Sequence, residues 1–133
     1  MACYNRQLSL REHSEKMIYI NSLTIAYGAL AIAILCEVAG TIYLMKSSQF
    51  TKLMPTLMMA VLYGCSFFFL SQALKTIPLG LAYALWGGLG IVVTALIGVA
   101  VFKQTLDLPA VLGISMIVGG VAVIHLFSQS TPH

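Results

Sequence analysis

The sequence contains very few charged residues. Only 8% of its 133 residues are Asp, Glu, Lys or Arg, whereas 59% are hydrophobic and the mean hydropathy is +0.94. A water-soluble domain carries about 25% charged residues. The chain therefore lacks the polar surface that a water-soluble fold requires, and we expect an integral membrane protein.

Cysteine pairs, clustered bases and catalytic motifs are also lacking, and these absences exclude several classes of function. The three cysteines are odd in number and widely spaced, which predicts neither a disulfide framework nor a zinc site. The sequence has no glycine-rich phosphate loop and no nucleophile motif. Lysine and arginine stand singly at the ends of apolar runs, as membrane-flanking residues do. We therefore expect no enzyme activity, no cofactor, no metal and no nucleic-acid partner.

Four apolar runs dominate the rest of the sequence. Each run is about as long as the roughly 20 helical residues that cross the hydrocarbon layer of a bilayer. They cover about 22–45, 54–74, 79–102 and 108–127. Because the links between them are short, successive helices must run antiparallel, and their backbone polar groups bond within each helix. The predicted fold is an all-α membrane domain of four transmembrane helices over residues 22–133.

The ends of these helices carry signals that do not depend on hydropathy. We place Pro55, Pro78 and Pro109 in the first turns of the second, third and fourth helices, where a missing N–H is harmless. Asp107 is positioned to cap the fourth helix. The helix boundaries are thus predicted twice, by hydropathy and by local backbone chemistry.

The N-terminal segment 1–21 is polar and of mixed charge. We expect it to be a tail without a function of its own, either disordered or not part of the native product, because Met17 could also start the chain. If the N-terminus is cytoplasmic, four Lys and Arg residues lie on the inside and three on the outside. If the chain starts at Met17, one lies inside and three lie outside. The inner bases are Arg6, Arg11, Lys16 and Lys75, and the outer ones are Lys46, Lys52 and Lys103. This weak bias predicts no fixed orientation, and it permits an antiparallel pair.

Glu37 is the acid within an apolar run. A lone carboxylate in a bilayer costs several kcal/mol unless it is protonated, paired with a cation or hydrated in a water-filled cavity. It could exchange a proton for a cation, or it could be a protonated hydrogen-bond donor between helices. Ala33, Gly40 and Thr41 lie one turn away on the same face, and Tyr27 lies further along it. This face of small and weakly polar residues leaves room beside the acid.

The second and third helices add aromatic rings and hydroxyl groups. Tyr63, Ser66 and Phe67 share one face of the second helix, and Tyr83 and Trp86 share one face of the third. Aromatic faces attract cations, and Trp attracts them best. Each of these aromatic residues taken singly is more often a packing residue or an interface anchor. Together with the acid they favour a binding site for a delocalised or quaternary cation.

Glycines mark the surfaces through which we expect helices to associate. Gly88 and Gly90 form part of a small-residue seam in the third helix, which suits close packing and could also bend. Gly113 and Gly120 lie in the fourth helix without polar neighbours, and we interpret that helix as an assembly surface. Four helices enclose a cavity poorly, so we expect a dimer that places two Glu37 side chains in one chamber.

These features resemble the small multidrug resistance family. The similarity extends from about Tyr27 to His133. Its segments are Ala33 with Glu37-Val38-Ala39-Gly40-Thr41, Met45-Lys46, Phe50-Thr51, Tyr63 with Ser66-Phe67, Pro78-Leu79-Gly80-Leu81-Ala82-Tyr83-Ala84-Leu85-Trp86, Gly88-Leu89-Gly90, Gln104-Thr105-Leu106-Asp107-Leu108-Pro109-Ala110 and Ser130-Thr131-Pro132-His133.

The resemblance implies a proton-coupled antiporter of the bacterial cytoplasmic membrane that works as an antiparallel homodimer. It implies that Glu37 binds protons and substrate in turn, and that Tyr63 and Trp86 line the site. It further places Tyr83 beside the site or at its gate. The glycines Gly88 and Gly90 would allow the third helix to kink.

The residues after the acid bear on the substrate. Gly40-Thr41 resembles the subtype that exports quaternary ammonium and polyaromatic cations, whereas the guanidinium-exporting subtype usually has Trp-Ala there. Gly87 departs from the family pattern, in which a hydroxyl residue commonly follows the Trp. Three alternatives stay open: export of guanidinium or polyamines, a heterodimer with a related chain, and a non-transporting membrane partner subunit.

Overall fold

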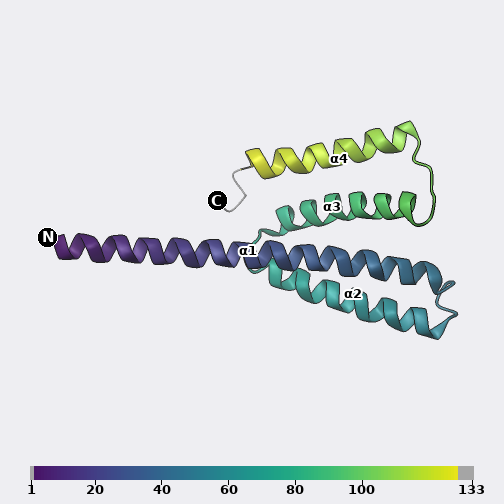
Figure 1. Cartoon of the computed structure of the whole chain (residues 1–133), viewed down its shortest axis with the longest axis horizontal. Helices are drawn as coiled ribbons and strands as arrows, with labels where there is room; N and C mark the ends of the chain where they lie inside the picture. The colour runs from purple at the N-terminus through teal and green to yellow at the C-terminus, as the bar shows by residue number, and fades with distance from the viewer. Residues whose placement is uncertain (1, 129–133) are drawn as a thin grey trace.

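The chain forms four helices joined by short links. The structure is a computed structural model that describes residues 2–128. The helices are α1 (Ala2–Lys46), α2 (Leu53–Ala73), α3 (Leu79–Ala100) and α4 (Leu108–Phe127), and no strand occurs among the described residues (Figure 1). Each helix contains a stretch long and apolar enough to cross a membrane. The predicted fold class, an all-α membrane protein with four spans, is confirmed.

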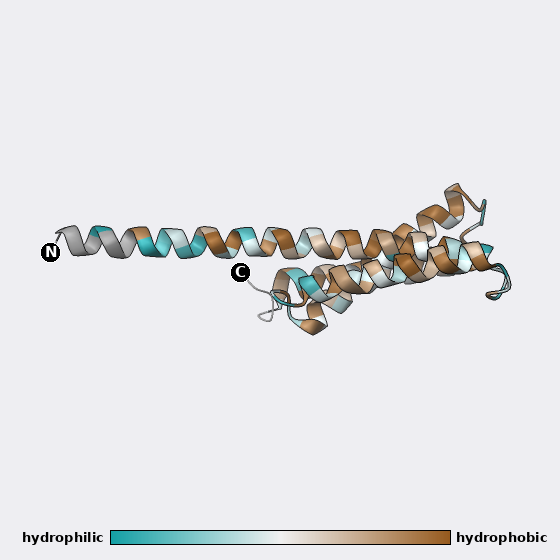
Figure 2. Cartoon of the chain, turned by 90° about the horizontal axis from the view of Figure 1, so that it is seen from below, coloured by the Kyte–Doolittle hydropathy of each residue, from teal (hydrophilic) through white to brown (hydrophobic). Residues whose placement is uncertain are grey.

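The first helix is longer than its predicted span. α1 begins at Ala2, so residues 2–21, expected to be a tail that is disordered or not native, continue the helix. This segment contains no glycine or proline, and Leu, Arg, Glu and Lys favour helix. It projects beyond the other helices as a single rod, with hydrophilic residues towards its free end (Figure 2). The division of the chain at residue 22 remains a prediction.

Two of the three proline positions agree with the prediction. Pro55 lies in the first turn of α2, and Pro109 lies in the first turn of α4. Asp107 caps α4 as expected, because its Oδ1 accepts a hydrogen bond of 3.0 Å from the backbone N–H of Ala110. Pro78 is instead the N-cap of α3, with an extended backbone (φ −55°, ψ 141°). Its fixed φ suits both positions, so sequence alone could not separate them.

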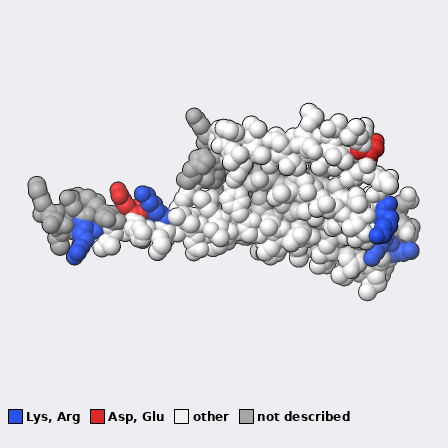
Figure 3. Space-filling view, turned by 45° about the horizontal axis from the view of Figure 1, so that its top comes forward, with Lys and Arg blue, Asp and Glu red and all other residues white. Residues whose placement is uncertain are grey.

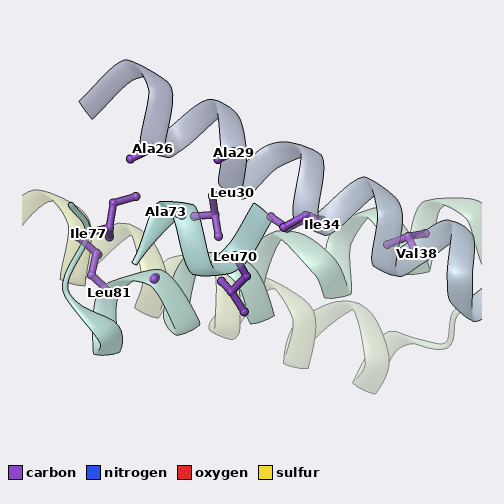
Figure 4. Close-up of a cluster of buried hydrophobic side chains, with 11 residues drawn as sticks. Ala26, Ala29, Leu30, Ile34, Val38, Leu70, Ala73, Ile77 and Leu81 are labelled. Carbon is purple, nitrogen blue, oxygen red and sulfur yellow. The ribbon is translucent and has the colours of Figure 1, made fainter. Parts of the chain in front are cut away.

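The core lies where α1 packs along α2 and meets the start of α3. Small side chains allow the helices to approach closely, and they alternate with larger aliphatic ones (Figure 4). The buried apolar residues are Ala26, Ala29, Leu30, Ala33, Ile34, Val38, Leu70, Ala73, Ile77, Leu81 and Ala82. α1 therefore packs against both α2 and α3, and this arrangement determines which of its faces borders the functional site.

α4 packs mainly against α3 and has no buried residue. Gly88 lies at this contact, where an added Cβ would come within 2.7 Å of the Val121 Cγ2 atom. Gly113 and Gly120 are different, because an added Cβ at either meets nothing within 4 Å. Within the described residues of one chain, therefore, no other helix packs against Gly113 or Gly120 as predicted for an assembly surface. Among the described residues on the face shown in Figure 3, charged side chains lie along the projecting part of α1 and at the opposite end of the bundle, with none between them, as in a membrane-spanning bundle.

Candidate functional site

A cavity of about 450 Å³ lies between α1 and α3 and contains Glu37. Three lining residues come from α1, six from α3 and one from the link between α3 and α4. They are Glu37, Val38, Thr41, Trp86, Gly87, Gly90, Ile91, Thr94, Ala95 and Gln104. The predicted acid, one predicted aromatic residue and one predicted hydroxyl residue are therefore brought together by α1 and α3, which run in the same direction because each is antiparallel to α2 between them in the sequence (Figure 1).

Glu37 is half-buried, and the side chain of Trp86 faces its carboxyl group. The indole N–H of Trp86 is buried and has no hydrogen-bond partner among the described residues. Gly90 lies directly beside the acid, since a Cβ built there would be 4.0 Å from the Glu37 Oε2 atom, an ordinary van der Waals distance. The cavity thus offers an acid, an aromatic face and an unpaired donor in one place.

Tyr63 is joined to the cavity through Thr41. The Thr41 hydroxyl donates to the Glu37 backbone carbonyl at 3.0 Å, and the Tyr63 hydroxyl lies 3.0 Å from the same Thr41 oxygen. A threonine hydroxyl has only one proton, so Tyr63 is the donor in the second bond. Gly40 accommodates the Tyr63 ring, since an added Cβ would lie 3.2 Å from its Cδ2 atom. This chain of bonds fixes the helical turn that carries the acid.

Tyr83 extends the aromatic surface around Trp86. The two rings meet edge to face, with centroids 5.3 Å apart and planes at 89°. Tyr83 is 47% exposed and does not itself line the cavity. Tyr83 thus lies beside a lining residue of the cavity, and the gate position that the family resemblance implies remains a prediction.

The other predicted lining residues lie away from this cavity. Ala33 and Ser66 are buried between α1 and α2, where the Ser66 hydroxyl donates to the Ala33 carbonyl at 2.8 Å. Phe67 is 55% exposed, and Tyr27 meets His125 edge to face with centroids 6.1 Å apart. Helical spacing identifies a face but not which neighbouring helix covers it. Contact of these four residues with a substrate remains a prediction.

Six residues of the cavity were not predicted from the sequence. The additional residues are Val38, Gly87, Ile91, Thr94, Ala95 and Gln104. Thr94 could have been found, because Trp86, Gly90 and Thr94 follow one another at intervals of four along one face of α3. Gln104 had no such signal. It reaches the cavity because Lys103 has a left-handed backbone (φ 54°) and the chain folds back towards α3.

The Thr41–Tyr63 hydrogen bond gives a testable coupling. We expect Thr41→Val and Tyr63→Phe each to lower the affinity for a cation, by loosening the turn that carries Glu37. Because both variants remove the same bond, the double variant should be no weaker than the worse single one, with a coupling of about 1 kcal/mol. Calorimetric titration of the four proteins with tetraphenylphosphonium measures this. Additive losses would show that the bond does not position the acid.

A family model described as Small Multidrug Resistance protein matches residues 25–117. That match includes Glu37, Trp86 and every other residue of the cavity. The chain belongs to the small multidrug resistance family.

Three curated relatives support the assignment to the small multidrug resistance family. Multidrug transporter EmrE of Escherichia coli is 48% identical over 101 residues, which cover 76% of this chain and 92% of EmrE. Quaternary ammonium compound-resistance protein QacF of Klebsiella aerogenes is 47% identical over 104 residues, 78% of this chain and 94% of QacF. QacG of a Staphylococcus strain is 43% identical over 104 residues, 78% of this chain and 97% of QacG.

The family and the four apolar helices together establish the location. This small multidrug resistance protein is a multi-pass protein of the bacterial cytoplasmic membrane. Glu37 therefore lies within a helix that crosses the bilayer, and the cavity beside it opens inside the membrane-spanning region.

Proposed function

We propose that the protein exports hydrophobic organic cations, quaternary ammonium compounds among them, in exchange for protons. The main support for this proposal is the cavity between two membrane-spanning helices, in which the Glu37 carboxyl group and the Trp86 indole face each other. A carboxylate binds the positive charge, and an aromatic face binds the apolar surface of a cation that has no N–H to donate. The relatives support this substrate class, because EmrE is named a multidrug transporter and QacF and QacG are named quaternary ammonium compound-resistance proteins.

Exchange follows from competition at one carboxyl group. An unpaired carboxylate is costly within a bilayer. Glu37 is therefore stable when it is protonated or paired with a cation, but not when it is charged and unpaired. A bound cation must therefore displace the proton, and a proton arriving from the other side must displace the cation. The proton gradient supplies the driving force for export. No reacting bond is needed, and the transporter names of the relatives support a non-enzymatic role.

The functional unit in this proposal is an antiparallel homodimer. The cavity is bordered by α1, α3 and a single link residue, and α4 leaves most of its surface uncovered. Gly113 and Gly120 on α4 offer backbone close to the surface, which suits helix association. A second copy would close the cavity with a second Glu37. Cross-linking in native membranes tests this, and a solely monomeric protein that still transports would contradict it.

A substrate panel separates this proposal from its nearest alternative. Proteoliposomes with an acidic interior should accumulate tetraphenylphosphonium and benzyl-substituted quaternary ammonium ions. They should accumulate guanidinium or a polyamine at least about tenfold less, because those ions depend on N–H donors for recognition. The reverse preference would assign the protein to guanidinium or polyamine export. Transport of no cation at all, in protein shown to be folded, would favour the non-transporting partner subunit.

A further inference from the structure

A second, smaller hollow of about 120 Å³ adjoins the Glu37 cavity. The two share Val38, Thr41, Thr94 and Gln104 as lining residues. The residues that line only the small hollow are Ile42, Met45, Ile97, Gly98 and Phe102. All five lie beyond the acid, towards the end of α1 and the end of α3. The small hollow is thus the continuation of the cavity towards the links that join α1 to α2 and α3 to α4.

The two spaces differ in chemistry. Glu37 and Trp86 line the larger cavity alone, and no charged residue lines the smaller one. The residues that belong only to the small hollow are apolar side chains and one glycine. A ligand that filled both spaces would therefore place a positive group beside the acid and an uncharged apolar group beyond it. That division matches a cation with one ammonium head and one alkyl chain.

Gln104 and Gly98 both line the small hollow and lie against each other. The Gln104 backbone N–H donates to the Gly98 carbonyl at 3.0 Å, which holds the link against the end of α3. Gly98 leaves space for the Gln104 side chain, since a Cβ there would lie 2.7 Å from Gln104 Oε1. Gln104 therefore lines both spaces.

We infer that this hollow is a subsite for the alkyl chain of an amphiphilic quaternary ammonium ion whose head pairs with Glu37. The inference rests on the proposed function, and it adds that the protein selects cations by chain length. The first few methylene groups beyond the head enter the small hollow and contact Ile42 and Ile97. Each buried methylene strengthens binding about fourfold, until the hollow is full.

The test compares alkyltrimethylammonium ions of increasing length on the purified protein. Affinities are measured by calorimetry in one detergent, and each is divided by the affinity for tetramethylammonium. Ile42→Phe fills the hollow from α1 and should weaken the butyl and hexyl compounds about tenfold or more, with tetramethylammonium changed less than about twofold. The matched control is Ile32→Phe, the same change on the same helix at a side chain that is 43% exposed. Ile32→Phe should change neither the affinity for the butyl and hexyl compounds nor the affinity for tetramethylammonium.

A second variant, with an effect in the opposite direction, tests the subsite independently if Ile42→Phe does not fold. Ile42→Ala enlarges the hollow, so the length at which affinity stops rising should increase by one or two methylene groups. Normal tetramethylammonium binding with no dependence of the chain-length profile on residue 42 would overturn this inference alone. Failure of the wild type to bind any cation of the series would overturn the proposed function, and this inference with it.

Discussion

Glu37→Gln should abolish proton-driven transport. The amide keeps the size and hydrogen-bonding capacity of the side chain but cannot carry the charge that a cation and a proton share. Removing one partner of a buried charge pair costs about 2–5 kcal/mol, which lowers affinity by roughly 30-fold to 4,000-fold. We expect uptake of tetraphenylphosphonium into proteoliposomes with an acidic interior to fall to the level of protein-free vesicles.

A matched change elsewhere on the same helix serves as the control. Glu15 is exposed in the N-terminal part of α1, beyond the predicted span. Glu15→Gln should transport at the wild-type rate. The Glu37→Gln protein must elute from size exclusion at the wild-type position, so that a loss of transport is not a loss of fold. A folded Glu37→Gln protein that still accumulates the cation against its gradient would contradict the exchange mechanism.

Replacing Trp86 should weaken cation binding in two separable steps. Trp86→Phe keeps an aromatic face but removes the buried N–H that has no partner, and a smaller ring attracts cations less well. Trp86→Ala removes the face altogether. A cation–π contact contributes about 2 kcal/mol when desolvated, so we expect a loss of roughly 30-fold for alanine and a loss of a few fold for phenylalanine.

Phe68→Ala is the control for removal of an aromatic ring. Phe68 is 59% exposed on α2 and does not line the cavity. Calorimetric titration with tetraphenylphosphonium compares the variants. Trp86 is the only tryptophan of the chain, so cation binding should also change the intrinsic fluorescence of the wild type. Unchanged affinity in Trp86→Ala, or an equal loss in Phe68→Ala, would show that the ring does not contact the substrate.

The sequence predicts the four spans well because hydropathy and capping act locally. The fourth span agrees at both ends, where Asp107 caps the helix and the last apolar residue is Phe127. The third span ends at Ala100, two residues before its predicted end, ahead of the turn at Lys103. The longer extent of α1 is the larger difference. A polar segment without helix breakers can continue a helix, and hydropathy detects only its apolar part.

The site could be predicted only in part, because it depends on which helices are neighbours. A lone acid in an apolar run identifies Glu37 without a structure. Helical spacing then indicates a face, but α1 has α2 on one side and α3 on another, and only the α3 side forms the cavity. Ser66 and Ala33 meet on the α2 side. Gln104 enters through the conformation of a link, which no periodic pattern encodes.

Binding of tetraphenylphosphonium across pH, with proton release followed in the same sample, tests most directly whether cation and proton compete at Glu37. Raising the pH removes the competing proton, so the affinity of the wild type should rise with pH and each bound cation should release protons. In Glu37→Gln both effects should vanish. Affinity independent of pH, with no proton released on binding, would contradict the account.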